Sequence, residues 1–525
     1  MSVLVGCWCP ASAGAAAAHY ALVDVVRLAL ENNADVLVQG ERVAAAQGQV
    51  QQAAGKFDLG VAAGMLQSRT VTPLARLGAN GLRQTSEHLV QYTVGANQLQ
   101  RNGNTLETAL TADSLRQDVS GGGLEPARNL LRLSMALNMP LLKGRGKDVA
   151  TLEVATSGMR LQISRYERRF RVSQVMQATL GAYWDYVARS KLEMLAQATA
   201  QRSAQLLAST EKLVEANERP RGDLVLLRAD YVDKAAAALR ASQALVEARR
   251  NLARLMGIEG NAAAAMALEQ EAFPPQADAI ARLVSLAPAL STLVAQGRAD
   301  ILGMELEREQ ASLQRTVARK NLQPQLDLSV GVAYGKASEG GSRYGFPGEA
   351  GQTPNTPSVF ARLQYQFPVQ NNVAKGQYAE RNAQLGEMEI RVRDAHIAAS
   401  NGVLTAVQRL AASAAQLRAA KESLSLYEQA VNQEMTKQKN GIATLIDVIT
   451  IEGRYNLAQV NAIELHADYA KALVNLQHET GTMLRPALGP GVVAAAGAGP
   501  ADEFAVNVRD LSGLAPVFDV LKVPL

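Results

Sequence analysis

Apolar residues recur every seven positions along residues 440–481, near the C-terminal end of the chain. The first row contains Val448, Tyr455, Ala462, Tyr469 and Leu476. The second row lies three residues further on and contains Ile451, Ala458, Leu465 and Ala472. Offsets of three and four within a seven-residue period place both rows on one stripe of an α-helix. The pattern predicts a helix that packs against a neighbouring helix as in a coiled coil.

The same pattern occurs once before, in residues 223–257. This segment and residues 447–481 both run from an aspartate to a glycine, so one shift aligns Asp223 with Asp447 and Gly257 with Gly481. The earlier stripe contains Leu224, Tyr231, Ala238, Leu245 and Leu252. A repeat of this size predicts a molecule built from two similar halves.

Four segments show a different pattern, in which apolar residues alternate with small or polar ones. They are residues 57–65 and 131–139 in the first half, and residues 326–334 and 359–367 in the second. Alternation predicts strands with one apolar face, and strands of roughly 9 to 11 residues are long enough to cross a membrane around an aqueous lumen. Four strands cannot close a barrel, and an open edge is unstable in lipid. Several chains must therefore contribute, and three chains would give twelve strands.

Two long proline-free segments, residues 148–217 and 375–440, follow the second strand of each half. At a rise of about 1.5 Å per residue, each predicted helix would be roughly 100 Å long. Uninterrupted helices of this length indicate a coiled coil or an elongated bundle. The chain then turns, at residues 217–222 and 440–444, and returns as the helices with the seven-residue stripes. Residues 22–55 and 298–321 predict a further helix at the start of each half.

These elements predict an α+β membrane protein with two tandem repeats and four strands per chain. The predicted divisions are a partial signal peptide or leader (1–18), a first repeat (19–260), a linker (261–297), a second repeat (298–484) and a C-terminal tail of unassigned role (485–525). The first repeat contains an insert at residues 70–128. Its segment 92–96 and the turn at Asn102-Gly103-Asn104 indicate a strand extension or a hairpin.

Both cysteines, Cys7 and Cys9, lie in the first ten residues. A chain otherwise without cysteine suits an oxidising compartment. The head is short and apolar, and Ala16-Ala17-Ala18 fits a signal-peptidase site. Cys7, preceded by Leu4-Val5-Gly6, is instead a candidate for lipidation at a lipoprotein cleavage box. A non-secreted alanine-rich start is the third interpretation.

Composition narrows the function. The chain has 525 residues, a formal net charge of +4 and an aromatic content of only 4%. The small charge gives no reason to expect a nucleic-acid partner. The five histidines show no metal-ligand spacing, and there is no Gly-x-Ser-x-Gly nucleophile motif. We therefore expect no enzyme activity, no catalytic residues and no cofactor.

The order of these elements resembles the TolC-type outer membrane efflux protein family. The resemblance extends over roughly residues 20–484. It is carried by the twofold succession of helix, strands, long helix, turn and helix, by Pro140-Leu141-Leu142-x-Gly144, by Phe367-Pro368, and by the stretch that begins Asn440-Gly441-Ile442-Ala443-Thr444. It implies a homotrimer whose strands form one twelve-stranded barrel in outer membrane lipid of a Gram-negative bacterium. The helices would form a tunnel through the periplasm.

The resemblance also implies a function. Such proteins are passive exit ducts of tripartite efflux pumps or type I secretion systems, and they work with a periplasmic adaptor (membrane fusion protein) and an inner-membrane RND or ABC transporter. The rival interpretation is a periplasmic coiled-coil structural or adaptor protein without a pore. It accounts for the long helices but not for the four alternating strands.

Candidate sites lie at the two helix turns. In the family the constriction at the periplasmic tip often carries acidic residues, which implies this role for Asp447 and, in the first repeat, for Asp223. An acid at a helix start also serves as a cap, so both interpretations stay open. Candidate adaptor contacts are Asn217, Arg219, Arg221, Asn440 and Gly441. Solvated charge at a turn is the alternative for the two arginines.

Overall fold

The structure is a computed structural model of the 525-residue chain. It describes residues 19–78, 81–119, 126–216, 220–260, 267–268, 272–277, 279–340, 356–440, 442–486 and 504–505. The chain divides into two compact units. The helical unit comprises residues 1–44, 163–304 and 391–525, and the sheet unit comprises residues 45–162 and 305–390.

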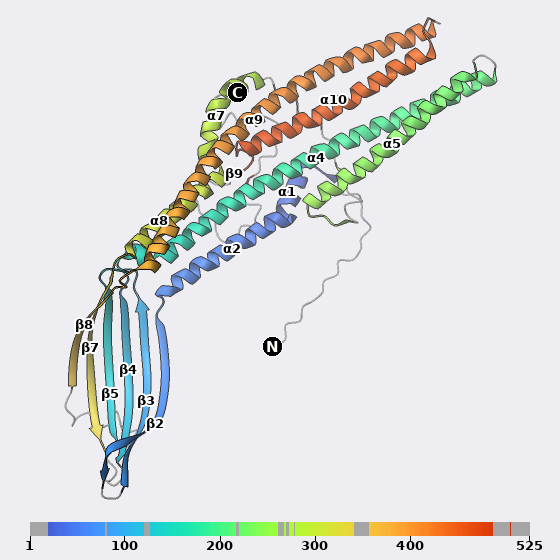
Figure 1. The fold of residues 1–525 in the computed structure, drawn as a ribbon. Helices are drawn as coiled ribbons and strands as arrows, with labels where there is room; N and C mark the ends of the chain where they lie inside the picture. The colour runs from blue at the N-terminus through green and yellow to red at the C-terminus, as the bar shows by residue number, and fades with distance from the viewer. Residues whose placement is uncertain are drawn as a thin grey trace. The chain divides into compact units, whose positions relative to one another are not determined.

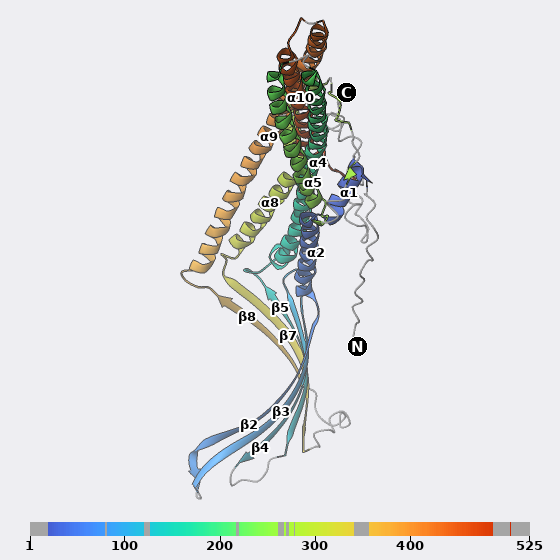
Figure 2. The same cartoon turned by 90° about the vertical axis from the view of Figure 1, so that its right-hand side faces the viewer.

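Two pairs of antiparallel helices dominate the helical unit (Figure 1). Helix α4 (Leu152–Glu215) is followed by α5 (Gly222–Leu255), and α9 (Asn372–Lys439) is followed by α10 (Leu445–Glu479). The long helices and the returning helices predicted from the sequence are confirmed. Within the helical unit, the α4–α5 and α9–α10 turns lie at the same end in both views (Figures 1 and 2).

Helix α10 contributes to the two larger hydrophobic cores described in the helical unit. Its Ala470 and Val474 belong to a core with α1, α4 and α5, in which Tyr183 and Leu252 are fully buried. Its other face belongs to a second core with α9 and α7 (Ile280–Gly297), where Tyr469 is fully buried. The seven-residue stripe therefore identified the helix around which this unit is packed.

Left-handed glycines end the two returning helices at equivalent points. Gly257 follows α5 with φ +70°, and Gly481 follows α10 with φ +67°. This conformation is costly for residues with a side chain, so a glycine is the favoured helix terminator. The correspondence supports the tandem repeat predicted from the sequence.

The first helix of the sequence prediction is two helices, α1 (Leu22–Asn32) and α2 (Ala34–Ala54). Asn33 separates them with an extended backbone. Its side chain accepts a hydrogen bond from the Asp35 amide and donates one to the Leu255 carbonyl, which ties this break to the end of α5. Asparagine favours such local bonding over a helix interior.

Part of the predicted linker is helical. Leu283, Leu290 and Val294 of α7 are buried against the α9–α10 hairpin. Among the described residues, α7 and the following α8 (Ala299–Lys320) form the one helical stretch that is long and apolar enough to cross a membrane. Because Leu283, Leu290 and Val294 are core residues of the helical unit, we assign α7 to that core.

The sheet unit contains one antiparallel sheet with the order β2-β3-β4-β5-β7-β8. The bounds are β2 (Gly60–Gly78), β3 (Gly81–Leu99), β4 (Thr105–Val119), β5 (Arg128–Pro140), β7 (Gln325–Glu339) and β8 (Thr356–Gln366). The four predicted strands correspond to β2, β5, β7 and β8. The predicted number of strands is corrected from four to six, because the insert forms β3 and β4 between β2 and β5.

The remaining described strands are two-residue pairs. Strand β1 (His19–Tyr20) pairs with β6 (Ala267–Leu268), and β9 (Arg485–Pro486) pairs with β10 (Phe504–Ala505). A short helix α3 (Lys147–Ala150) precedes α4. The predicted leader at residues 1–18 lies outside the described residues, and so does most of the tail.

Candidate functional site

The sheet has one apolar face that extends over all six strands. In register, one row across the sheet is Val61, Ala96, Thr108, Met135, Val332 and Val359. The next row is Ala63, Val94, Leu110, Leu133, Tyr334 and Pro357. Most of the large side chains in these rows are exposed, up to 80% for Val359. An exposed apolar surface of this extent indicates contact with lipid or with another protein.

The opposite face of the sheet is small and polar. One row on this face is Ala62, Gly95, Ala109, Ser134, Ala333 and Ser358. Other positions on it include Thr93, Asn97, Glu107, Arg132 and Gln364. Alternation between an apolar and a polar face, sustained over six strands, is typical of a barrel with lipid outside and water inside.

The apolar band has the height of a membrane. On β7 it runs from Leu326, which pairs with Tyr365, to Lys336, which lies in the same row as Tyr92. Ten residues at about 3.4 Å each cover about 34 Å along the strand. A strand tilt of about 40° reduces this to about 26 Å, close to the apolar band of about 25 Å in outer membrane barrels. Beyond it, the same face carries a polar row at Arg69, His88 and Arg116.

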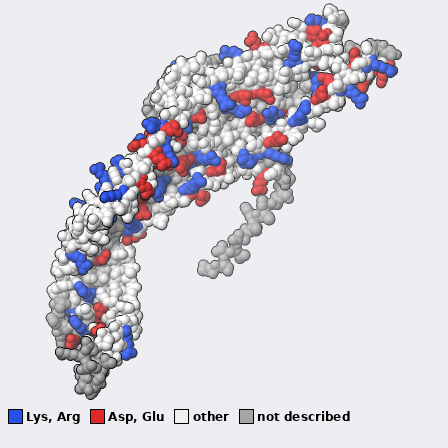
Figure 3. All heavy atoms as spheres, in the orientation of Figure 1, with Lys and Arg blue, Asp and Glu red and all other residues white. Residues whose placement is uncertain are grey.

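Charged side chains are distributed accordingly. On the face shown in Figure 3, Lys, Arg, Asp and Glu are frequent over the helices and sparse over the strands. This agrees with strands that expose apolar side chains and helices that expose polar ones.

The α9–α10 turn holds Asp447 in a capping box. The Asp447 carboxylate accepts hydrogen bonds from the Thr444 amide (2.9 Å) and hydroxyl (2.6 Å), and the Asp447 amide donates to the Thr444 hydroxyl (3.3 Å). These hydrogen bonds from the Thr444 side chain and backbone lower the pKa of Asp447. The cap predicted from the sequence is therefore formed. Because the carboxylate remains exposed and ionised, the structure also leaves it accessible to cations.

The other candidate residues lie at or beside the turns. Asp223 is in the first turn of α5, two residues after Arg221, and Asn440 is exposed directly after α9. Asn217, Arg219 and Gly441 lie outside the described residues, as does Cys7. The described members of both groups are thus brought to one end of the helical unit (Figure 1).

Helix α5 carries a second seven-residue stripe, which the sequence analysis missed. Val225, Val232, Leu239 and Val246 are exposed to between 40% and 74%. Ala229 and Ala236 lie four residues after the first two and are also exposed. The sequence shows this stripe by the same seven-residue spacing. Each of its residues directly follows a residue of the first α5 stripe, which is half-buried or buried. An apolar stripe on an exposed helix face indicates a further helix as its partner.

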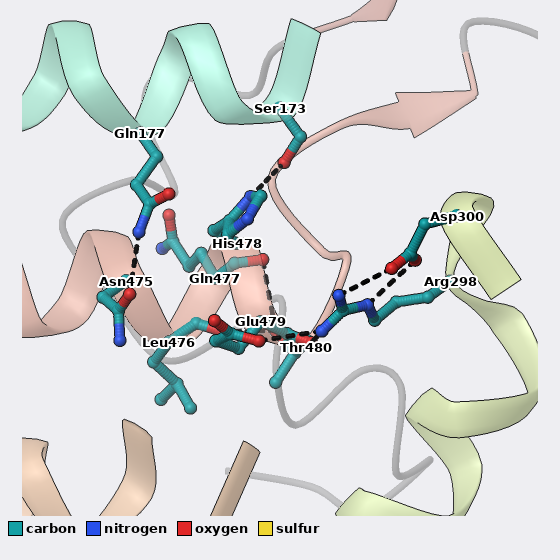
Figure 4. A network of polar contacts seen from close by, with 10 residues as sticks. All are labelled: Ser173, Gln177, Arg298, Asp300, Asn475, Leu476, Gln477, His478, Glu479 and Thr480. Atoms are coloured by element: carbon teal, nitrogen blue, oxygen red, sulfur yellow. Dashed lines mark hydrogen bonds and ion pairs between the residues drawn. The ribbon is translucent and has the colours of Figure 1, made fainter. Parts of the chain in front are cut away.

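A buried polar network joins the end of α10 to α8 and α4 (Figure 4). The Arg298 guanidinium donates two hydrogen bonds to the Asp300 carboxylate (2.8 and 3.0 Å) and one to the Glu479 carboxylate (2.8 Å). The Arg298 side chain is only 11% exposed. Burial works to lower the pKa of Arg298, but its bonds to the two carboxylates outweigh this effect and raise it. The arginine therefore stays charged and joins the start of α8 to the end of α10.

A neighbouring pair belongs to the same network. The His478 ring nitrogen Nδ1 lies 2.8 Å from the Ser173 hydroxyl on α4, and burial lowers the pKa of His478. No group of three or more histidine, cysteine or acidic residues with the geometry of a metal site occurs in the described part of the chain. The network has the properties of a structural clamp.

Comparisons with known proteins agree with this geometry. The family model for outer membrane efflux proteins matches residues 290–482. The fold is similar to that of VceC from Vibrio cholerae, with a TM-score of 0.62, 16% identity, and coverage of 88% of this chain and 96% of that one. It is also similar to CmeC from Campylobacter jejuni (0.60, 15%, 88% and 85%) and MtrE from Neisseria gonorrhoeae (0.58, 15%, 87% and 88%). No curated protein sequence gives a significant match.

The fold and the partial family match agree with one class of protein. The chain has the fold of the TolC-type outer membrane channels, and its second half matches the outer membrane efflux protein family. The resemblance predicted from the sequence is confirmed. The matched family consists of channel proteins and not of enzymes, and its outer membrane location is the one that the sequence predicted.

Proposed function

We propose that this protein is the outer membrane component of a tripartite efflux pump or a type I secretion system. Three copies form a passive exit duct in the outer membrane that extends into the periplasm. A periplasmic adaptor and an inner-membrane RND or ABC transporter supply the connection and the energy. The duct itself provides a water-filled passage.

The observation that carries this proposal is the two-faced sheet. Its apolar face is exposed over about 26 Å, which matches the hydrocarbon layer of an outer membrane. Its small and polar face suits an aqueous lumen. Tyr365 near one edge of the band and Tyr92 near the other fit aromatic girdles at the two membrane surfaces. A single chain leaves both sheet edges open, and lipid does not tolerate open edges, so several copies must close the structure.

The exposed stripe on α5 supports assembly through the helices as well. Val225, Val232 and Leu239 repeat every seven residues, as in the seam of a coiled coil. A lumen-facing surface would be polar, so we assign this face to a neighbouring copy. A pore-free adaptor could use the same stripe, but it would have no use for an exposed apolar sheet face of membrane height.

The turns supply the proposed entrance. Three copies of Asp447 around the axis would form a ring of ionised carboxylates at the periplasmic tip, with Asp223 in the equivalent place of the first repeat. Arg221 and Asn440, with Asn217, Arg219 and Gly441, are the proposed contacts for the adaptor. The accessible, ionised state of Asp447 supports the ring, while its bonds to Thr444 show that it also caps α10.

Conductance in a planar lipid bilayer tests the proposed duct. The detergent-extracted protein should insert and give uniform single-channel steps. Divalent cations added at the periplasmic side should block the current by binding the Asp447 ring. Absence of channel steps from a preparation that is folded and membrane-extracted would contradict the function.

The α5 stripe offers a separate test of assembly. Val232→Glu places a charge in the middle of the stripe, where it is exposed in the single chain. We expect a folded chain that no longer forms trimers on size-exclusion chromatography with light scattering. Arg240→Glu, on the neighbouring exposed row, is the control and should leave the trimer intact. A normal trimer from Val232→Glu would remove this face from the interface.

A further inference from the structure

We propose that each chain contributes six strands to the barrel, so that three copies close a barrel of eighteen strands. In this arrangement β8 of one copy pairs with β2 of the next. The partner at each open sheet edge is therefore a second copy of this chain. The inference rests on the proposed trimeric duct and replaces the twelve strands that the sequence predicted.

The inserted hairpin is an integral part of the sheet. Strand β3 pairs with β2 on one side and with β4 on the other, in continuous register from Thr85 to Leu99 on the β4 side. Strand β4 pairs with β5 from Thr105 to Leu115. No direct β2–β5 pairing is present in the described sheet, whose order is β2-β3-β4-β5-β7-β8. Removing the hairpin from the barrel would break both of these ladders.

The hairpin has the same two faces as the other strands. Its apolar side carries Val90, Tyr92, Val94, Ala96, Leu106, Leu110 and Ala112, in the rows of the membrane band. Its opposite side carries Gln91, Thr93, Asn97, Glu107 and Asp113. A hairpin outside the barrel would present this polar side to lipid, which is costly. Within the barrel, the same side faces water.

The hairpin is also fixed at its inner turn. Gly103 lies so close to the β5–α4 connection that an added Cβ would be 3.1 Å from the Gly144 carbonyl oxygen and 3.6 Å from Pro140. The Arg101 guanidinium lies over the Phe57 ring, 5.9 Å from its centre. The turn therefore packs against the bases of both β5 and β2, the two strands that would be neighbours without the insert.

The two outer edges suit closure by copies of the same chain. Strands β2 and β8 are the ends of the sheet and each has one unpaired edge. The strands alternate in direction, and six is an even number, so β8 of one copy runs antiparallel to β2 of the next. A two-strand insert preserves this relation, whereas a single added strand would not. Closure satisfies every backbone edge in lipid.

The consequence is a wider barrel. With strands about 4.8 Å apart and tilted about 40°, a twelve-stranded barrel has a backbone diameter of about 24 Å and an eighteen-stranded one about 36 Å. Barrels of 16–18 strands are known to hold an aqueous channel. The outer membrane part of this duct would then admit wider solutes than a twelve-stranded barrel could.

Disulfide trapping tests the strand order and the closure together. The native cysteines are confined to Cys7 and Cys9, so Cys7→Ser/Cys9→Ser gives a cysteine-free background. The pair Val94→Cys/Leu110→Cys joins register partners on β3 and β4 and serves as the reporter of the observed sheet. The pair Ala63→Cys/Leu133→Cys places one cysteine on β2 and one on β5. In the six-strand order these strands are three strand spacings apart, about 14 Å, which is too far for a disulfide. They would be adjacent if the hairpin lay outside the barrel.

Closure between copies is tested by Val61→Cys on β2, combined in turn with Val359→Cys, Ala361→Cys or Leu363→Cys on β8. We expect at least one combination to give bands at two and three times the chain mass of 55.9 kDa on non-reducing gels. We also expect the reporter pair to close and the β2–β5 pair to stay open. Closure of the β2–β5 pair, or a trimer whose β2–β8 pairs never close, would overturn the inference.

Electron cryo-microscopy of the native-sequence trimer provides the second measurement. Eighteen strands in the barrel would confirm the inference, and twelve would refute it while leaving the duct intact. A preparation that forms no trimer would instead contradict the proposed function. The two failures are therefore distinguishable.

Discussion

The Arg298 clamp makes a quantitative prediction. Arg298 bonds both Asp300 and Glu479 and lies 5.6 Å from the centre of the Phe170 ring. The change Arg298→Met keeps most of the side-chain volume but removes the charge. Two carboxylates, 20% and 24% exposed, then lose their shared cation in a mostly buried place. We expect a large loss of stability without loss of the overall fold.

The size of the effect follows from burial. Removing one partner of a buried ion pair costs about 3–5 kcal/mol, whereas an exposed pair is worth at most about 1 kcal/mol. The unfolding entropy of about 2.1 cal/mol/K per residue amounts to about 1.1 kcal/mol/K for the whole chain. The midpoint of thermal unfolding, Tm, should therefore fall by about 3–5 °C. The matched control is Arg171→Met, because Arg171 pairs with Asp35 at the surface, and its Tm should fall by about 1 °C or less.

The assay is thermal unfolding in detergent followed by circular dichroism at the helix band. A second variant, Arg298→Met/Glu479→Gln, removes one of the orphaned charges and should recover part of the lost Tm. If Arg298→Met unfolds within 1 °C of the parent protein, or if it matches Arg171→Met, the clamp does not stabilise the helical unit as argued.

Three further predictions concern other parts of the helical unit. Gly257→Ala should lower Tm more than Gly481→Ala. Both changes force a left-handed alanine, which costs about 1–3 kcal/mol, but only at Gly257 would the new Cβ lie 2.6 Å from a backbone oxygen of α1. Equal shifts in Tm would contradict this close approach. Burial, with the charges of two lysines, lowers the pKa of His466 to about 4, below the ordinary value of 6.5. The unfolded chain therefore takes up the proton first, and the stability of the folded chain should fall as pH drops from 6.5 to 4. His466→Gln should flatten the curve of Tm against pH in that window, and an unchanged curve would contradict the assignment. Asp447→Asn keeps an oxygen that can cap α10 but removes the charge, so divalent-cation block of the pore should weaken while helix content stays the same. The control Thr444→Ala should preserve the block. Unchanged block in Asp447→Asn would contradict the proposed carboxylate ring.

The sequence predicted the helices well because their cores repeat at a fixed spacing. Tyr469 and Leu476 of the first stripe are fully buried in the structure. Gly257 and Gly481 end the returning helices, as the alignment of the two halves required. Periodicity is a local signal, and here it matched the packing.

The misses have physical causes of their own. The linker at residues 261–297 was predicted from the alanine run 262–265 and Pro274-Pro275, and helix α7 within it was not anticipated. Leu283 and Leu290 of α7 are buried by helices far along the chain, which no local pattern indicates. The hairpin of β3 and β4 was predicted as one of two alternatives for the insert, and the structure confirms it. Its full length was not predicted, because charged residues at the far end of both faces weaken the alternation. The contact of Arg298 with Glu479 joins residues 181 positions apart, so no local pattern indicates it.

The candidate sites divide in the same way. The cap at Asp447 follows from a threonine three residues earlier and was predicted from the helix start. The exposed stripe on α5 has the same seven-residue spacing as the more buried stripe beside it. The more buried stripe alone was enough to predict the helix, so the exposed one was not recognised. Only the exposure of Val225 and Leu239 in the folded chain separates the two.

Electron microscopy of the protein extracted from membranes in detergent tests directly whether three copies form a duct in the outer membrane. The protein is to be expressed with a secretion signal and imaged as particles without chemical cross-linking. We expect threefold particles with a detergent belt around the strands and a helical stalk outside it. A soluble particle that carries no detergent belt would contradict the proposed duct, because the apolar face of the sheet would then have no membrane to face.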